Sequence, residues 1–122
     1  MSDIILTTED WKIQLLNDHN KERQRQGLVE FRWNPNLEQL AKKQIEEIRQ
    51  KGRVHHGNVP SSGLQNIANG KKNLLKPDVP IRLWLSDSGH KAPIIKKDFR
   101  YIGGWFSRDQ ENNVVIVCNY SS

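Results

Sequence analysis

Apolar side chains recur at helical spacing over one long segment, which begins at Asn34 and ends before Gly52. Asn34 is a good helix N-cap, the proline after it suits the first helical position, and a glycine commonly follows a helix C-terminus. Steps of three and four residues separate the members of one stripe, which are Leu37, Leu40, Ala41, Gln44, Ile45 and Ile48. The pattern predicts an amphipathic helix over 34–50.

A second helix is predicted over 8–26. Acidic residues occupy its first turn, a threonine can cap it, and Gly27 follows its last turn. Its apolar stripe begins with Trp11 and Leu15 and turns polar in the second half, at Asp18 and His19.

The segment 52–70 has no helical period, and Gly, Ser, Asn, Pro and His dominate it. This composition predicts a long irregular segment with room for one short strand. Irregular segments of such length inside a domain are more often functional than idle.

The last third of the chain predicts two short helices and a hairpin. Asp78 and the proline two residues later open a helix that runs to 85, and after a break a further short helix occupies 90–98. Strands are predicted over 101–106 and 114–118, joined by a polar connection into an antiparallel hairpin.

These elements predict an α+β fold, in the form of an α/β/α sandwich whose helices flank a small antiparallel sheet. The length of 122 residues suits a single domain over 1–122. In that sandwich, the stripe of the helix over 34–50 is expected to be buried against the hairpin through Leu37, Ala41, Ile45 and Ile48.

The composition narrows the class of protein. Cys118 is the single cysteine, which rules out an intramolecular disulfide and a cysteine-based zinc ribbon, and its apolar neighbours predict a buried thiol. No apolar run approaches the roughly 18 residues of a membrane span. Acidic residues stand near the N-terminus where a signal peptide needs basic ones. The pattern favours a cytoplasmic protein, or one assembled into a particle, over a classically secreted one.

The net charge of +5 raises the question of nucleic-acid binding. Lysines and arginines neutralise phosphates whatever the base sequence, but here acids interrupt the basic clusters and the clusters lie in every segment. A solvated basic surface explains them equally. We expect no specific nucleic-acid binding, and any nonspecific association to be lost at physiological salt.

Histidines are the residues best suited to carry chemistry. The common metalloprotease, phosphate-loop and nucleophile-elbow motifs are absent. His55 and His56 lie in the irregular segment and His90 stands at the start of a short helix, so two of them could meet and bind a divalent metal. They could equally be surface or capping residues, and the residues alone leave both interpretations open.

Five fragments, in order along the chain, carry a family resemblance. They are H-N-x-x-R at 19–23, W-N-P-N-L at 33–37 followed by Ala41, V-H at 54–55 with G-L-Q-N-I-A at 63–68, W-L-S-D-S-G-H at 84–90, and V-C-N-Y at 117–120. Together they resemble the CAP superfamily, or SCP/TAPS domain, of cysteine-rich secretory, antigen 5 and pathogenesis-related proteins. The chain is similar to a compact bacterial or phage-like member without the family's disulfides, and the resemblance implies an α/β/α sandwich.

The resemblance also implies a cleft, because the family has one with two histidines and two acids that holds zinc in some members. The histidines fall on His55, with His56 as the fallback, and on His90. The first acid falls on Gln65, beside Asn66, and the second on Asp87. Glutamine keeps the shape of glutamate but cannot ionise. The implied metal ligands are therefore His55 and His90, with weak zinc binding and no required cofactor.

Three functions follow from this cleft of His55, Gln65, Asn66, Asp87 and His90. The first is a non-enzymatic CAP module that binds an unidentified protein or small molecule there. The second is a metal-assisted hydrolase with His90 or Asp87 as general base. The third is a structural component of a larger assembly such as a phage or virus particle. The loss of the family glutamate favours the first.

Overall fold

The computed structural model describes residues 7–60 and 62–122. Its elements in chain order are α1 (Thr8–Arg25), β1 (Arg32–Trp33), α2 (Pro35–Lys51), β2 (Leu64–Lys71), the 3₁₀-helix η1 (Lys72–Leu75), α3 (Val79–Leu85), α4 (Ser88–Ile94), β3 (Tyr101–Arg108) and β4 (Asn113–Ser121). No helix in the described ranges is long and apolar enough to cross a membrane. Residues 1–6, on which the prediction about a signal peptide partly depends, lie outside the description.

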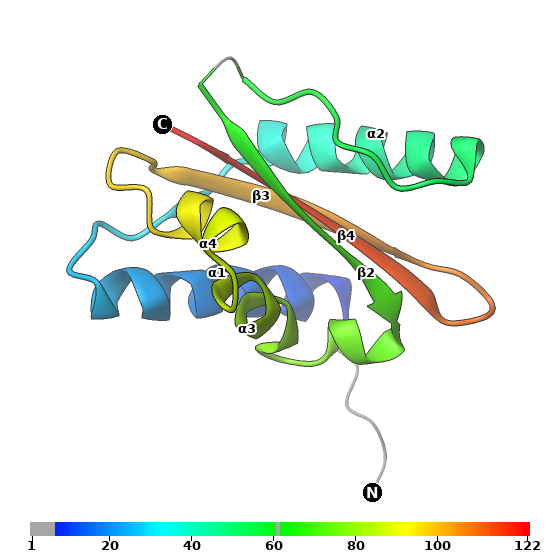
Figure 1. Ribbon diagram of the computed structural model, residues 1–122, viewed down its shortest axis with the longest axis horizontal. Coiled ribbons are helices and arrows are strands. Elements are labelled where there is room, and N and C mark those ends of the chain that lie inside the picture. The colour runs from blue at the N-terminus through cyan, green and yellow to red at the C-terminus, as the bar shows by residue number, and fades with distance from the viewer. Residues whose placement is uncertain (1–6, 61) are drawn as a thin grey trace, which may run out of the picture.

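The four strands form one sheet in the order β1-β3-β4-β2. Helix α2 covers one face of the sheet, and α1, α3 and α4 lie on the other face (Figure 1). This arrangement confirms the predicted α/β/α sandwich. The sheet is mixed and not purely antiparallel, because β1 pairs parallel with β3 while β3–β4 and β2–β4 are antiparallel. A strand of two residues is too short to leave a periodic signal in the sequence.

Helix α2 has the predicted ends and the predicted buried stripe. The Asn34 side chain accepts hydrogen bonds from two backbone N–H groups of the first turn, and Gly52 ends the helix in the left-handed conformation with φ of 71°. Ala41, Ile45 and Ile48 pack against Val117 of β4. The prediction that this helix packs on the terminal hairpin is confirmed, and Leu37 is buried as well.

One glycine lets α2 approach the sheet closely. A Cβ atom on Gly103 of β3 would lie 2.5 Å from the backbone nitrogen of Glu38 and 2.6 Å from the carbonyl oxygen of Asn34. Contacts this short are not compatible with any side chain, so the first turn of α2 sits directly on the strand.

The largest departure from the sequence prediction is β2. The segment 52–70 was expected to be irregular with one short strand, yet Leu64–Lys71 pairs with β4 along its whole length. Its asparagines and glycine are poor strand formers, so tertiary pairing with the apolar β4 determines its conformation. Among the described residues of this segment, 52–60 and 62–63 remain without a regular element, and η1 follows the strand directly.

Helix α4 also lies earlier than predicted, at Ser88–Ile94 and not at 90–98. The cause is Asp87, whose carboxylate accepts hydrogen bonds from the backbone N–H groups of Gly89 and His90 and so caps the helix. The predicted break at 86–89 is therefore largely the first turn of a helix. Strands β3 and β4 extend two or three residues beyond their predicted ends.

The polar second half of α1 is buried and cross-links the layers. The His19 ring lies 2.7 Å from the carbonyl oxygen of Leu15 and 2.8 Å from the hydroxyl of Tyr120. The Asn20 amide makes two hydrogen bonds to the backbone of Phe31. The guanidinium of Arg23 donates to four backbone carbonyls, those of Val29, Ile94, Lys96 and Phe99.

We predict that Ile45→Asp prevents stable folding. Ile45 is 4% exposed in the layer between α2 and the sheet, and an unpaired carboxylate there costs several kcal/mol, against a total stability of roughly 5–15 kcal/mol for a domain. Thermal denaturation followed by circular dichroism measures the effect. The control is Lys43→Asp on the exposed side of the same helix. Cooperative melting of Ile45→Asp at the wild-type temperature would contradict the assignment of this face to the core.

We also predict an acid-sensitive stability that depends on His19. Burial lowers the pKa of His19 from 6.5 to about 4, so the folded state holds the ring neutral. As the pH falls from 6.5 towards 4, the unfolded chain takes up a proton that the folded chain does not. This difference removes about 3 kcal/mol of stability over that range.

Urea denaturation at several pH values between 7 and 4.5 tests the prediction, with His19→Gln as the comparison. The variant is expected to be less stable at pH 7 and to lose less stability on acidification. Equal slopes in the two proteins would show that another group causes the acid sensitivity.

Candidate functional site

The candidate site lies at β2, the strand at one end of the sheet. Neighbouring strand residues point to opposite faces, so Gln65 and Asn66 lie on different sides of the sheet. The Gln65 amide nitrogen donates to Asn119 Oδ1 at 2.8 Å, and Asn119 in turn donates to the carbonyl oxygen of Leu37 in α2. Gln65 therefore belongs to the α2 side.

The Gln65 side chain makes three hydrogen bonds, and its oxygen accepts two of them. Its Oε1 lies 2.9 Å from Nδ1 of His56 and accepts a bond of 3.1 Å from the backbone N–H of Gly57. An amide oxygen only accepts, so the His56 ring donates from Nδ1, and in the neutral ring Nε2 is the acceptor. This glutamine therefore orients one imidazole and leaves its second nitrogen available.

His55 points elsewhere. Its Nδ1 lies 3.1 Å from Nε2 of Gln44 in α2, and the same amide also donates to the His55 carbonyl. Nε2 of His55 is buried and has no hydrogen-bond partner among the residues that the structure describes. The histidine that lies beside Gln65 is therefore the fallback, His56, and a role for His55 as a ligand stays a prediction.

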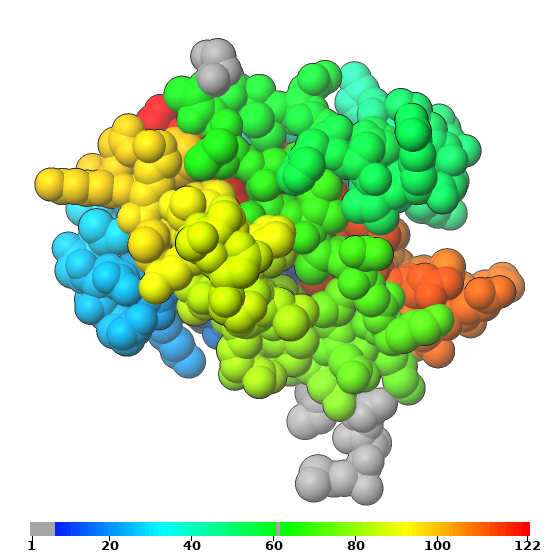
Figure 2. Space-filling model, viewed as in Figure 1, coloured from blue at the N-terminus to red at the C-terminus, as the bar shows by residue number. Residues whose placement is uncertain are grey.

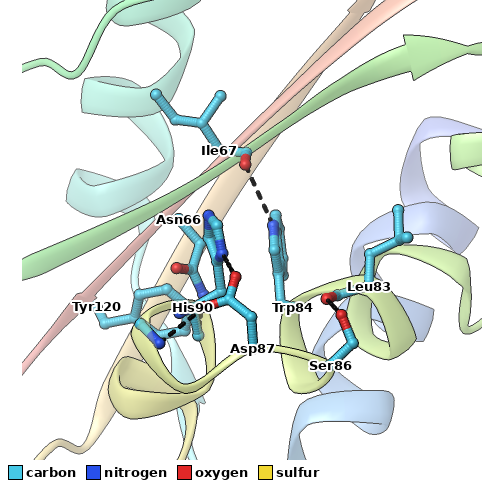
Figure 3. Close-up of polar contacts among 9 residues, drawn as sticks. Asn66, Ile67, Leu83, Trp84, Ser86, Asp87, His90 and Tyr120 are labelled. Atoms are coloured by element: carbon cyan, nitrogen blue, oxygen red, sulfur yellow. Dashed lines mark hydrogen bonds and ion pairs between the residues drawn. The ribbon is translucent and has the colours of Figure 1, made fainter.

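On the other side of β2, Asn66 connects the core to α4 (Figure 3). Its Nδ2 donates to the carbonyl oxygen of His90 at 2.8 Å and to the hydroxyl of Tyr120 at 3.2 Å. That hydroxyl also contacts His19, and burial raises the pKa of Tyr120 well above its usual value. Asn66 therefore positions the backbone at His90.

Asp87 and His90 form an exposed pair at the start of α4 (Figure 3). Oδ2 of Asp87 is hydrogen-bonded to Nδ1 of His90, while Oδ1 caps the helix. The hydrogen bond from the His90 ring, aided by the backbone N–H groups of the cap, lowers the pKa of the Asp87 carboxyl. Side-chain exposures of 54% for Asp87 and 48% for His90 place the pair in contact with solvent.

The structure thus brings the predicted residues together in two pairs, His56 with Gln65 and Asp87 with His90. No hydrogen bond or ion pair joins the two within 7–60 and 62–122, and the same residues contain no group of three His, Cys, Asp or Glu that could hold a metal. A catalytic zinc usually has three protein ligands. Two imidazoles and a carboxylate already bonded to one of them fit such a site poorly.

The Ser86 hydroxyl is engaged in a hydrogen bond and the Cys118 thiol is buried. Ser86 Oγ donates to the carbonyl oxygen of Leu83 at 2.6 Å. Burial raises the pKa of the Cys118 thiol to about 12, so it stays protonated at neutral pH, as its apolar sequence neighbours predicted.

Sequence reasoning missed two residues of the site, Asn119 and Gln44. Asn119 is fully buried in β4 and holds the Gln65 amide, and Gln44 holds His55. A buried amide in an otherwise apolar strand was a visible signal, since such a group requires hydrogen-bond partners. Gln44 lies in the apolar stripe of α2, and the sequence pattern therefore placed its side chain on the packed face of the helix.

Solved structures share this fold. An outer surface protein from Borrelia burgdorferi is 18% identical with a TM-score of 0.81, and the similarity covers 99% of this chain and 98% of that one. A cysteine-rich secretory protein from Staphylococcus aureus is 16% identical with a TM-score of 0.72, covering 99% of this chain and 41% of that one. NaASP2, in a crystal structure with Zn²⁺, is 13% identical with a TM-score of 0.70, covering 98% and 83%.

Identities this low establish the fold alone, and no curated protein matches the chain. The model of the CAP family, described as the cysteine-rich secretory protein family, matches residues 16–120. That match includes all the fragments that carried the resemblance. The chain therefore belongs to the CAP family of cysteine-rich secretory proteins.

Proposed function

We propose that this protein is a non-enzymatic binding module whose ligand or partner contacts the two histidine pairs at β2, His56–Gln65 and Asp87–His90. The observation that carries the proposal is the state of Gln65. All of its hydrogen bonds go to the protein, and a carboxamide neither accepts a proton nor provides negative charge for a metal.

The hydrogen-bonding groups of His56 and His90 suit the recognition of a ligand or partner. His56 and His90 each have one ring nitrogen fixed, by Gln65 and Asp87 respectively, so each presents Nε2 in a defined direction. A neutral imidazole with a fixed orientation accepts a hydrogen bond from a hydroxyl, amide or ammonium group with little loss of side-chain entropy. A partner rich in hydrogen-bond donors fits this surface.

A hydrolase is the second candidate, and one observation favours it. Asp87 holds the His90 ring as a carboxylate holds the general base of a catalytic triad. The same carboxylate is the N-cap of α4, however, which explains its position without catalysis. Hydrolysis of p-nitrophenyl acetate that is lost in both His90→Ala and Asp87→Asn would support the hydrolase over the binding module.

We predict weak zinc binding that a single substitution strengthens. With two imidazoles and no glutamate, we expect a dissociation constant on the order of tens of micromolar or weaker. Gln65→Glu should tighten binding, since it adds a fixed negative charge beside His56. Isothermal titration calorimetry with zinc chloride measures both proteins.

The controls separate the residues of the site. Gln50→Glu makes the same chemical change on the exposed surface of α2 and should leave zinc affinity unchanged. His56→Ala and His90→Ala should weaken binding, and His55→Ala tests the predicted role of His55 as a ligand, because its ring is bonded to Gln44 and not to Gln65. Nanomolar affinity in the wild type, or no response to Gln65→Glu, would contradict the prediction of weak zinc binding limited by the missing glutamate.

A further inference from the structure

A groove lies between the C-terminal half of α2 and the β3–β4 hairpin, and neither it nor the hollow beside it is lined by the histidine pairs. It has a volume of about 830 Å³, and a second hollow of about 360 Å³ adjoins it through shared residues such as Ile48 and Val115. Figure 2 shows the notch between the teal α2 and the orange hairpin at the edge of the molecule.

The floor of the groove is apolar. Ile45 and Ile48 come from α2, and Trp105 and Val115 come from the sheet. The ammonium group of Lys42 lies 4.2 Å from the centre of the Trp105 ring, so the indole is fixed at the wall. An apolar side chain of a partner could be buried on this floor.

The rim of the two adjoining hollows is basic. Five cations line it, namely Lys42, Arg49, Arg53, Lys71 and Arg108, against two acids, Glu46 and Asp109. Both acids already have partners: Glu46 lies 3.8 Å from Arg49, and Asp109 accepts three hydrogen bonds from the hairpin turn. Arg108 and Lys71 donate to the neutral amides of Asn112 and Asn113. Lys71 also interacts electrostatically with Asp109, and Lys42 lies 3.5 Å from Glu38, so the cations of the rim outnumber the acids but are partly compensated.

A free strand edge completes the groove. The short β1 pairs with β3 only at Tyr101 and Ile102, although β3 continues to Arg108. Residues 105–108 all line the groove, including Phe106, whose ring packs 4.8 Å from that of Trp11 on the other face of the sheet. The backbone of β3 is therefore part of the groove wall, and no further strand pairs with it among the described residues.

From these features we infer that the groove binds an acidic peptide segment in extended conformation, which adds as a strand to β3 at 105–108. Backbone hydrogen bonds to an open edge provide affinity for a peptide, the basic rim selects acidic side chains, and the apolar floor accepts the alternate ones. A nucleic acid or a fatty acid would use the charge or the floor but not the strand edge. The inference concerns a surface separate from the proposed histidine site, so either can fail alone.

The probe is a fluorescein-labelled decapeptide in which Glu alternates with Val, with a Lys–Val peptide as its control. Fluorescence anisotropy at about 50 mM salt should show binding of the acidic peptide only, weakening at higher salt. Arg49→Glu with Arg108→Glu should reduce its affinity by roughly tenfold or more. Lys21→Glu with Lys97→Glu gives the same net charge change at exposed positions away from the groove and should reduce the affinity by about twofold at most.

The strand addition is tested with two further peptides, N-methylated at the odd or at the even positions. A bound strand uses one edge, so one peptide should lose binding and the other should keep it. Equal binding by both peptides, or equal effects of the two charge reversals, would overturn the inference. So would tighter binding of oligo(dT) or oleate that the groove reversal abolishes, because the occupant would then be a nucleic acid or a fatty acid.

Discussion

The rest of the structure depends on a buried cation, the guanidinium of Arg23. The residue is fully buried, and the central carbon of its planar group lies 4.1 Å from the centre of the Phe31 ring. It donates to carbonyls in the connection after α1 and in the connection between α4 and β3. Burial lowers the pKa of Arg23, but guanidinium stays charged under all ordinary conditions. A charge this deep is tolerated because its N–H groups make four hydrogen bonds to carbonyl oxygens.

That constraint determines where α4 and the start of β3 can lie. Two of the four acceptors are Ile94 and Phe99, at the end of α4 and just before β3, so α1 holds the connection between them. The neighbouring His19 holds Tyr120 of β4, and Tyr120 shares Asn66 of β2 with the backbone of His90. Hydrogen bonds thus run from the centre of the molecule to the base of the candidate site. The H-N-x-x-R motif builds the scaffold, and the position of the Asp87–His90 pair depends on it.

Elements whose signals lie within one short segment could be predicted from the sequence, while elements formed by contacts between distant segments could not. Helix α2 could be predicted because its cap, its proline and its apolar stripe all lie within one segment. The full length of strand β2 could not be predicted, because Asn66, Asn69 and Gly70 form a strand only by pairing with β4, nearly fifty residues later in the chain. The candidate site shows the same division. The family pattern named His55, with His56 as the fallback, together with Gln65, Asp87 and His90. Which histidine lies beside Gln65 depends on the contact of His55 with Gln44 of α2, which no spacing reveals.

The two proposed recognition surfaces differ because the two sides of the sheet leave different groups exposed. At β2, the indole nitrogen of Trp84 donates to the carbonyl oxygen of Ile67, and the Asn66 side chain donates to the backbone of α4. Part of the hydrogen-bonding groups of this strand are therefore used by contacts with the helix layer. The polar groups that remain exposed near β2 are those of the two histidine pairs. At β3, the partner strand β1 stops after two pairs, and the groove beside the remaining residues has cations at its rim. Open strand edges invite other chains, and charge decides which of them can approach. A basic edge repels a second copy of a protein with net charge +5 and remains open to an acidic strand.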